Sequence, residues 1–392
     1  MKTVYLETGN KSECYGCGIC EIKCPNHAIK MEVDERGFLF PRINNQKCSD
    51  CGICENVCPE KSQKNKFIGE LYAVEHKQKE VLANSQSGGA FTAISDYFLN
   101  DGGVVYGAVL DADLNATHIR AQSSEERDNM RGSKYVQSII TQDVLKLIEN
   151  DIRRKKKVLF TGTPCQCAAI KRNWENEDNL TVCDFICHGT PSPKVWKDYL
   201  EYIQKKIGKE IKTAHFRIQE QEGQGHHTEK LITEDEMEYV SIDYAGLFYT
   251  HLAHRESCFS CQFADIYRCS DITIGGYLDY GKKGIKDNLG VSMCFLNSEK
   301  GKYIFENILN SINSEKKEIT FFKNQPCLYN PVHKEDRYED FWQDYGKIDF
   351  DELLRKYVTD EVKKKYGLMV TGGGYKHIGI IGIEHAFGII FA

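Results

Sequence analysis

The pattern of apolar and polar positions divides the chain near residue 66. Beyond that point, short apolar runs alternate with amphipathic stretches, which predicts strands separated by helices. Parallel strands need such crossover connections, so the pattern predicts an α/β domain with a mostly parallel or mixed sheet. We expect strands at residues 71–77, 104–111, 157–161, 180–187, 270–276 and 291–297. We expect helices at residues 87–103, 141–156, 193–206 and 351–367.

Before residue 66 the chain is organised by cysteines, in two nearly identical runs. CYGCGICEIKCP (14–25) and CSDCGICENVCP (48–59) both have the spacing C-x2-C-x2-C-x3-C-P, which bacterial ferredoxins use for cubane 4Fe–4S clusters. In two-cluster proteins the fourth cysteine of each run ligates the other cluster. We therefore expect an α+β ferredoxin-like module with two clusters. The first would be held by Cys14, Cys17, Cys20 and Cys58, and the second by Cys48, Cys51, Cys54 and Cys24.

Zinc and disulfides are the alternative explanations for these cysteines. Zinc sites use two separated pairs of ligands rather than runs of four. A disulfide framework belongs to secreted proteins, and the start of this chain has no apolar segment typical of a signal peptide. The 17 cysteines therefore indicate a reducing cytoplasm in which thiolates serve as metal ligands.

The length and charge of the chain limit its organisation and its partners. A chain of 392 residues is too long for one core, and the lysine-rich KSQKNK (61–66) is typical of a linker. The chain has a net charge of −6, whereas nucleic-acid-binding proteins typically carry a basic surface, so the charge argues against that class. No apolar run is long enough to span a membrane. We divide the chain into four segments, 1–66, 67–150, 151–345 and 346–392, the last being a helical tail with an apolar end.

Two expected helices begin with residues suited to chemistry. Ser87, Gly88 and Gly89 begin the helix at 87–103, where free amide groups fit either an anion site or an ordinary capped helix. In TGTPCQ (161–166), Thr163 suits the N-cap and Pro164 the first helical position. Cys165 then lies in the first turn, where the helix dipole stabilises a thiolate.

A third group of four cysteines is predicted from topology. Cys165 and Cys187 follow two strands joined by a crossover, so both should lie at the same edge of the sheet. Cys258 and Cys261 form a C-x2-C pair that would complete the ligand set of a third 4Fe–4S cluster. In the alternative, Cys165 and Cys187 are buried packing residues, and the pair binds separately or not at all. We take Cys167, Cys183, Cys294 and Cys327 as packing residues.

Other candidates lie near this edge. His188 could donate a proton to a reduced cofactor or substrate, or could simply cap a loop. Lys134 and Tyr135, in RGSKYVQS (131–138), could hold a phosphate and stack on a ring.

Taken in order, several segments resemble the coenzyme F420 hydrogenase/dehydrogenase beta-subunit family over residues 70–345. They are SGGAFTAI, RGSKYVQS, VLFTGTPCQCAAI, CDFICHGTPSPKVWKDYL and RESCFSCQFADIYRCSDITIG. The resemblance implies FAD in the α/β domain, beside a cubane cluster held by Cys165, Cys187, Cys258 and Cys261. It implies that the flavin region includes Ser87, Gly88, Gly89, Lys134, Tyr135, Thr163 and Pro164.

Two further features qualify this resemblance. Family members usually continue with DITIGD-x-WG, whereas Gly276 and Leu278 replace the acid and the tryptophan here, which affects the substrate side. The tail HIGIIGIEHAFGIIFA (377–392) resembles the opening strand of polysaccharide pyruvyl transferases, which implies such a neighbour and a truncated or split fusion.

The expected function is that of a cytoplasmic iron–sulfur flavoprotein oxidoreductase. Electrons would pass between a ferredoxin-like partner, the clusters and FAD, with a small diffusible substrate reduced or oxidised at the flavin. One alternative is an electron-transfer subunit that serves a partner enzyme. The other is a redox or scaffold component of a polysaccharide-modifying complex.

Overall fold

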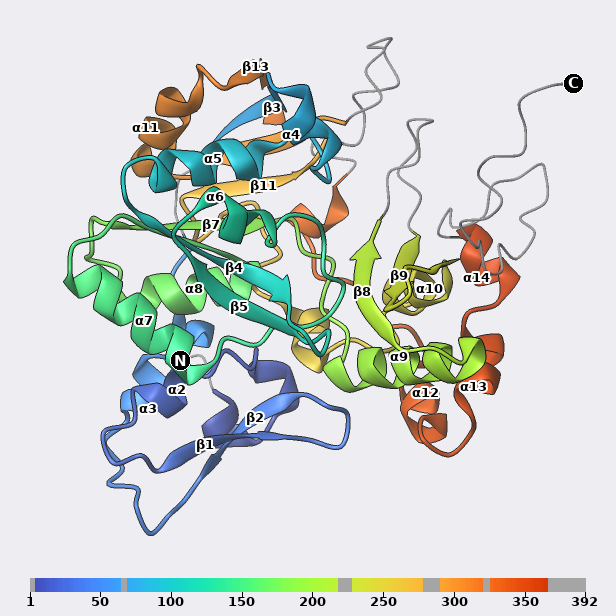
Figure 1. The fold of residues 1–392 in the computed structure, drawn as a ribbon. Coiled ribbons are helices and arrows are strands. Elements are labelled where there is room, and N and C mark those ends of the chain that lie inside the picture. The colour runs from blue at the N-terminus through green and yellow to red at the C-terminus, as the bar shows by residue number, and fades with distance from the viewer. Residues whose placement is uncertain (1–3, 65–68, 218–227, 278–289, 320–324, 366–392) are drawn as a thin grey trace, which may run out of the picture.

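The computed structural model describes residues 4–64, 69–217, 228–277, 290–319 and 325–365. The N-terminal module lies against one side of a large mixed sheet, and a second lobe flanks that sheet (Figure 1). The tail at 377–392, with the implied fusion, lies outside the described residues, as does Leu278.

The N-terminal module consists of short elements around its cysteines. The strands β1 (Ile29–Val33) and β2 (Leu39–Ile43) pair antiparallel. Gly18 and Gly52 are the N-caps of the short helices α2 (Ile19–Ile22) and α3 (Ile53–Asn56). Both glycines have the left-handed backbone that a side chain disfavours, with φ of 76° and 69°. The remaining elements are α1 (Tyr5–Thr8), η1 (Lys11–Glu13) and η2 (Pro59–Lys61).

The α/β domain is built on an eight-stranded sheet with the order β13-β3-β12-β11-β7-β6-β4-β5. Its central neighbours β11, β7, β6 and β4 run parallel, and the outer pairs run antiparallel. The strands are β3 (Glu70–His76), β4 (Val104–Leu110), β5 (Ala116–Ala121), β6 (Val158–Gly162), β7 (Leu180–Phe185), β11 (Ile272–Gly276), β12 (Ser292–Leu296) and β13 (Ile312–Lys317). The predicted fold class, an α+β module followed by an α/β domain with a mixed sheet, is confirmed.

Helices cover both faces of this sheet (Figure 1). On one face α5 (Ala90–Leu99) and α11 (Glu299–Ile308) pack through residues such as Ile94 and Phe305. On the other face α7 (Gln142–Arg153) and α8 (Pro164–Asn173) share a core with Ile19 of the N-terminal module. The short helices α4 (Lys79–Ala83) and α6 (Ser124–Asp128) complete the domain.

The second lobe is a small sheet, β10-β9-β8, with helices around an aromatic core. Trp196, Tyr199 and Tyr244 are almost fully buried in it. Its strands are β8 (Ile211–Phe216), β9 (Glu229–Thr233) and β10 (Glu238–Ser241). Its helices are α9 (Pro193–Ile207), α10 (Asp243–Tyr249), α12 (Tyr338–Asp344), α13 (Phe350–Tyr357) and α14 (Asp360–Lys365).

The helix expected at 351–367 is two helices within the described residues. α13 ends at Tyr357, and the Thr359 hydroxyl accepts a hydrogen bond from the Val362 N–H at 3.3 Å. A threonine in this position caps a new helix and ends the preceding one. The predicted N-cap at Thr141 is present, because its side chain accepts from the Val144 N–H.

The eight-stranded sheet takes strands from both 67–150 and 151–345. The boundary near residue 150 therefore lies within one packed unit, and its meaning as a domain border stays a prediction. Among the described residues, no helix has the length and apolar character needed to cross a membrane.

Candidate metal centres

The first group of cysteine thiols comes from both repeats, as the spacing predicts. Burial raises the pKa of Cys17, and the neighbouring thiols of Cys58 and Cys14 raise it further. Burial also raises the pKa of Cys20, together with the thiols of Cys17, Cys14 and Cys58. The pKa of Cys58 rises to about 12, again mainly through burial. Four thiols that repel one another when ionised fit a cationic iron centre, because metal binding takes up their negative charge.

The second group lies closer to solvent. Cys24, Cys48 and Cys54 pack around the buried Ala28, and Cys51 is exposed. The Ala28 N–H donates to Cys24 Sγ at 3.2 Å. Burial raises the pKa of Cys54, and Cys51 contributes to the same shift. The structure thus brings together the second set named from the sequence, and its role as a ligand set stays a prediction.

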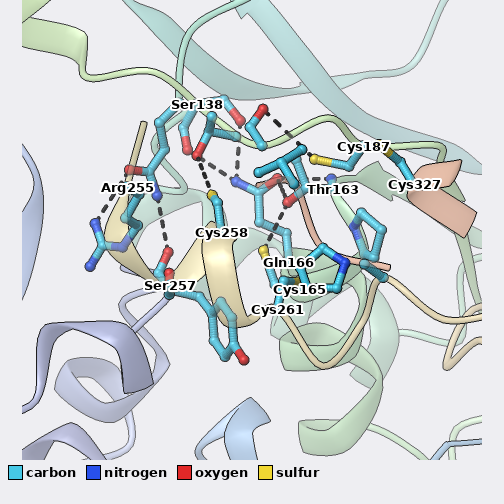
Figure 2. A pocket seen from close by; sticks show the side chains of 18 of the residues that line it. Ser138, Thr163, Cys165, Gln166, Cys187, Arg255, Ser257, Cys258, Cys261 and Cys327 are labelled. Atoms are coloured by element: carbon cyan, nitrogen blue, oxygen red, sulfur yellow. Dashed lines mark hydrogen bonds between the residues drawn. The ribbon is translucent and has the colours of Figure 1, made fainter. Parts of the chain in front are cut away.

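The third group surrounds a cavity at the carboxyl edge of the parallel strands (Figure 2). Cys165 lies in the first turn of α8, and Cys187 follows β7. Cys258 lies in η3 (Glu256–Ser260), and Cys261 directly follows it. Burial raises the pKa of Cys187, with the thiols of Cys258, Cys165 and Cys261 adding to the shift. The structure therefore brings the four side chains named from the sequence to one cavity, and their role as a ligand set stays a prediction.

Hydroxyl groups support this cavity. Thr163 Oγ1 lies 3.2 Å from Cys165 Sγ, and Thr190 Oγ1 lies 3.7 Å from Cys258 Sγ. Burial raises the pKa of Cys165 to about 11, which the Thr163 contact partly opposes. Such hydrogen bonds to sulfur are among the features that set the potential of an iron–sulfur cluster.

Four cysteine thiols around one cavity are the donor set of a 4Fe–4S cluster, so the residues present fit the group. In the part of the chain that the structure describes, no three His, Cys, Asp or Glu side chains lie close enough to hold a single metal ion.

The glycines at the start of α5 are explained by packing. A Cβ atom on Gly88 would lie 2.1 Å from the Val74 carbonyl oxygen of β3. Gly89 is the left-handed N-cap of α5, with φ of 77°. Ser87 lies beside Gly276, at the end of β11. These contacts agree with a helix that begins at a tight turn without a side-chain cap, and the assignment of all three residues to a flavin stays a prediction.

Lys134 and Tyr135 are already engaged within the protein. The Lys134 ammonium group donates to the carbonyls of Asn129, Arg131 and Gly132, at 2.8 to 3.3 Å. Burial lowers its pKa to about 7. The Tyr135 ring stacks on Phe248, with centroids 4.2 Å apart. In this conformation, three carbonyls occupy the three N–H groups of the lysine, and the flavin role of both residues remains untested.

His188 lies next to Cys187. Its Nδ1 is 3.4 Å from the Sγ of Cys327, and Cys327 lines the cavity. Its carbonyl oxygen faces His254 Nε2 at 3.1 Å. The imidazole is held close to the third group, and burial lowers its pKa. His188 is not one of the residues that line the cavity, and its role as a proton donor stays a prediction.

Several lining residues were not identified from the sequence. Cys327 was expected to be a packing residue, whereas it lines the cavity as well as being buried. Tyr15, Arg255 and Arg268 line it too. Arg255 begins the RESCFSC segment, and its position just before the cysteine pair was the sequence feature that could have indicated its place on the lining. Thr163 and Pro164, assigned to the flavin region, lie on the same lining.

The three groups form a continuous series. The thiol of Cys54, in the second group, influences the pKa of Cys20 in the first. The thiol of Cys165, in the third group, influences the pKa of Cys17 in the first. The first group therefore lies between the other two. We call the groups outer (Cys24, Cys48, Cys51, Cys54), inner (Cys14, Cys17, Cys20, Cys58) and crevice (Cys165, Cys187, Cys258, Cys261).

Comparisons with known proteins match both the cysteine-rich module and the α/β domain. Residues 71–146 and 155–320 match the N-terminal and C-terminal family models described as coenzyme F420 hydrogenase/dehydrogenase, beta subunit. Residues 13–62 match a 4Fe–4S dicluster domain. Among solved structures, the chain is similar to one in the xenon-derivatised F420-reducing [NiFe] hydrogenase complex from Methanosarcina barkeri. The identity is 17%, the match covers 74% of this chain and 97% of that chain, and the TM-score is 0.47. No curated protein matches the chain.

Proposed function

The chain belongs to the coenzyme F420 hydrogenase/dehydrogenase beta-subunit family, and on that premise we propose that it is an iron–sulfur flavoprotein oxidoreductase. Its membership and its 4Fe–4S domain mark it as an iron–sulfur electron-transfer protein. The proposal adds a third cluster at the crevice group, FAD beside it, and a small substrate reduced or oxidised there.

The observation that carries the proposal is the order of the three thiol groups. The outer group includes an exposed cysteine, Cys51, and the crevice group lines a cavity inside the α/β domain. The inner group connects them, since Cys20 packs with outer-group cysteines and Tyr15, next to Cys14, packs with Cys165 and Cys261 of the crevice group. A series that runs from the surface to a cavity suits the transfer of single electrons between an external redox protein and an internal site.

The contacts between the module and α8 hold this series in place. Arg172, near the end of α8, donates from Nε to the Asn56 carbonyl at 2.7 Å and from Nη1 to the Lys61 carbonyl at 2.9 Å. Cys165 lies near the start of the same helix. One rigid element therefore fixes the distance between the crevice group and the segment that carries Cys58.

FAD supplies the chemistry that the clusters lack, because a flavin exchanges two electrons with a substrate and single electrons with a cluster. The crevice edge is the place where open α/β sheets bind ligands. We propose that the flavin site at this edge includes Ser87, Gly88, Gly89, Lys134, Tyr135, Thr163 and Pro164. His188 is the proposed proton donor to the substrate.

Anaerobic purification followed by measurement of iron, sulfide and flavin per chain tests the proposal. Roughly twelve irons are expected for three cubanes and roughly eight for two. Cys165→Ala should lower the iron content by roughly four. Cys167→Ala is the matched control, because Cys167 lies in the same helix, is fully buried and faces the carbonyls of Gly162 and Cys183. Equal iron contents in the two variants would contradict the third cluster.

An electron-transfer subunit without its own substrate is the second candidate. The family match supports it, since that match marks an iron–sulfur electron-transfer protein without showing a flavin. Purified protein with full iron content and no flavin would favour this candidate over the oxidoreductase.

A further inference from the structure

Arg255 lies between the inner group and the crevice cavity. Its side chain is 1% exposed and lines the cavity (Figure 2). Its Nε donates to the carbonyl oxygen of Cys14 at 2.7 Å, and its Nη2 donates to that of Leu39 at 2.8 Å. Its Nη1 donates to Gln137 Oε1 at 3.3 Å. The guanidinium group therefore touches the backbone of an inner-group cysteine from the side of the cavity.

The charge of Arg255 has only neutral partners in the described part of the chain. Its hydrogen bonds go to two carbonyls and one amide, and its Cζ lies 4.2 Å from the ring centroid of Phe40. None of the ion pairs found among the described residues includes it. A buried cation costs several kcal/mol unless a negative charge compensates it. The compensating charge must therefore come from the groups on either side.

The other buried guanidinium on the lining, that of Arg268, differs in this respect. Arg268 is 2% exposed, and its Nη1 lies 3.8 Å from the Asp184 carboxylate. Burial raises the pKa of Asp184, and Arg268 opposes that rise. Arg268 thus has a carboxylate within the protein, whereas Arg255 faces thiols.

We propose that Arg255 is a positioning residue whose counter-charge is the net negative charge of the thiolate-ligated clusters at the inner and crevice groups, and that it raises the reduction potential of both. The proposal rests on the proposed function. A cluster with four thiolates gains one negative charge when it takes up one electron, with no bond made or broken. A buried cation stabilises that more negative state, because little water screens it. The outer group, on the far side of the inner one, lacks this cation.

The test is an anaerobic redox titration, followed by electron paramagnetic resonance, of wild type, Arg255→Gln and Arg255→Lys. Glutamine removes the charge, and lysine keeps it while losing the forked geometry. At the wild-type midpoint potential, Arg255→Gln should make the reduced-to-oxidised ratio of the inner and crevice centres about tenfold lower. For a one-electron couple that is a shift of about 59 mV. The ratio in Arg255→Lys should stay within about twofold of wild type, and the outer centre should not change in either variant.

Arg172→Gln is the control for loosening of the module. It removes two hydrogen bonds between α8 and the module and should leave the crevice centre at its wild-type potential. The inner centre is not compared in this variant, because the charge of Arg172 itself acts on Cys58. Unchanged potentials in Arg255→Gln, or equal shifts in Arg255→Gln and Arg255→Lys, would overturn the proposal.

Iron content separates the remaining outcomes. If Arg255→Gln loses iron, the result for Arg255→Lys decides. Full iron content and wild-type potentials in Arg255→Lys support the proposal. Loss of iron in Arg255→Lys as well would show that Arg255 has a purely structural role. If the wild-type protein carries roughly eight irons, the third cluster is absent and that part of the proposed function is wrong. The role of Arg255 is then still decided at the inner centre, through its contact with Cys14.

Discussion

The two cysteine repeats have almost the same sequence and opposite surroundings. Ile19 of the first repeat is 1% exposed and belongs to the core shared by α7 and α8, whereas Ile53 of the second is 36% exposed. Tyr15 of the first is buried, with its hydroxyl donating to Glu60 at 2.7 Å. Ser49, the matching residue of the second, is exposed. The first repeat is therefore packed against the rest of the protein, and the second repeat faces solvent.

This difference gives the module a direction. Two identical repeats would present two equivalent clusters, whereas here the first copy is held against the residues that line the crevice cavity. Gln137 of that lining donates to the Tyr15 carbonyl at 3.0 Å. The residues between the cysteines, rather than the cysteines themselves, decide which cluster faces inward.

The largest effect should come from replacing the fourth cysteine of either repeat with alanine. Cys58→Ala should remove the inner cluster and Cys24→Ala the outer one, because each fourth cysteine serves the other repeat's cluster. Both variants should lose roughly four irons. Only Cys58→Ala should stop electron transfer from an external redox protein to the crevice while leaving the outer cluster reducible. Electron paramagnetic resonance of the reduced proteins identifies which signal is lost.

Cys183→Ala is the control, since this buried cysteine lies in the middle of β7 and outside the three groups. Loss of the outer signal in Cys58→Ala would show that each repeat binds its own cluster.

Local spacing and strand order predicted which thiols of the two repeats, and which of Cys165 and Cys187, lie near one another, whereas the role of these thiols as cluster ligands stays a prediction. The repeats fix the inner and outer groups through short loops, and the crossover from β6 to β7 brings Cys165 and Cys187 to one edge. The N-caps at Thr141 and Thr163 followed from residues next to the helices they begin. Each of these features depends on neighbours in the chain or on one parallel connection.

The features that were missed depend on distant partners. The edge strand β13 pairs with β3, far earlier in the chain, and its polar sequence INSEKK has little apolar alternation. The lobe around β8, β9 and β10 closes its core with α12 and α13, which come much later in the chain. Arg255 reaches Cys14 across 241 positions, so no local pattern could indicate that contact.

A smaller effect should come from truncating the matched isoleucines. Ile19→Ala removes a side chain from a closed core and should cost about 2–5 kcal/mol. Ile53→Ala removes a side chain that water already reaches and should cost less than about 1 kcal/mol. Anaerobic denaturant unfolding of the two iron-loaded variants measures the difference. Equal losses would mean that the two repeats are buried alike, contrary to the direction inferred above.

The smallest effect tests the position where the repeats differ by one side chain. Gly16 and Asp50 occupy the same place and share a left-handed backbone, with φ of 69° and 51°. A Cβ on Gly16 would lie 2.9 Å from Arg255 Nη1 and 3.1 Å from the Leu39 carbonyl oxygen. Gly16→Ala therefore combines backbone strain with overpacking and should cost about 2–4 kcal/mol. Asp50→Ala should cost less than about 1 kcal/mol, because Asp50 is exposed. Asp50→Gly isolates the backbone term, since it relieves the left-handed strain without adding a contact. If Gly16→Ala cost no more than Asp50→Ala, Arg255 would not be in close contact with Gly16. The contact with Arg255 would then not distinguish the first repeat from the second.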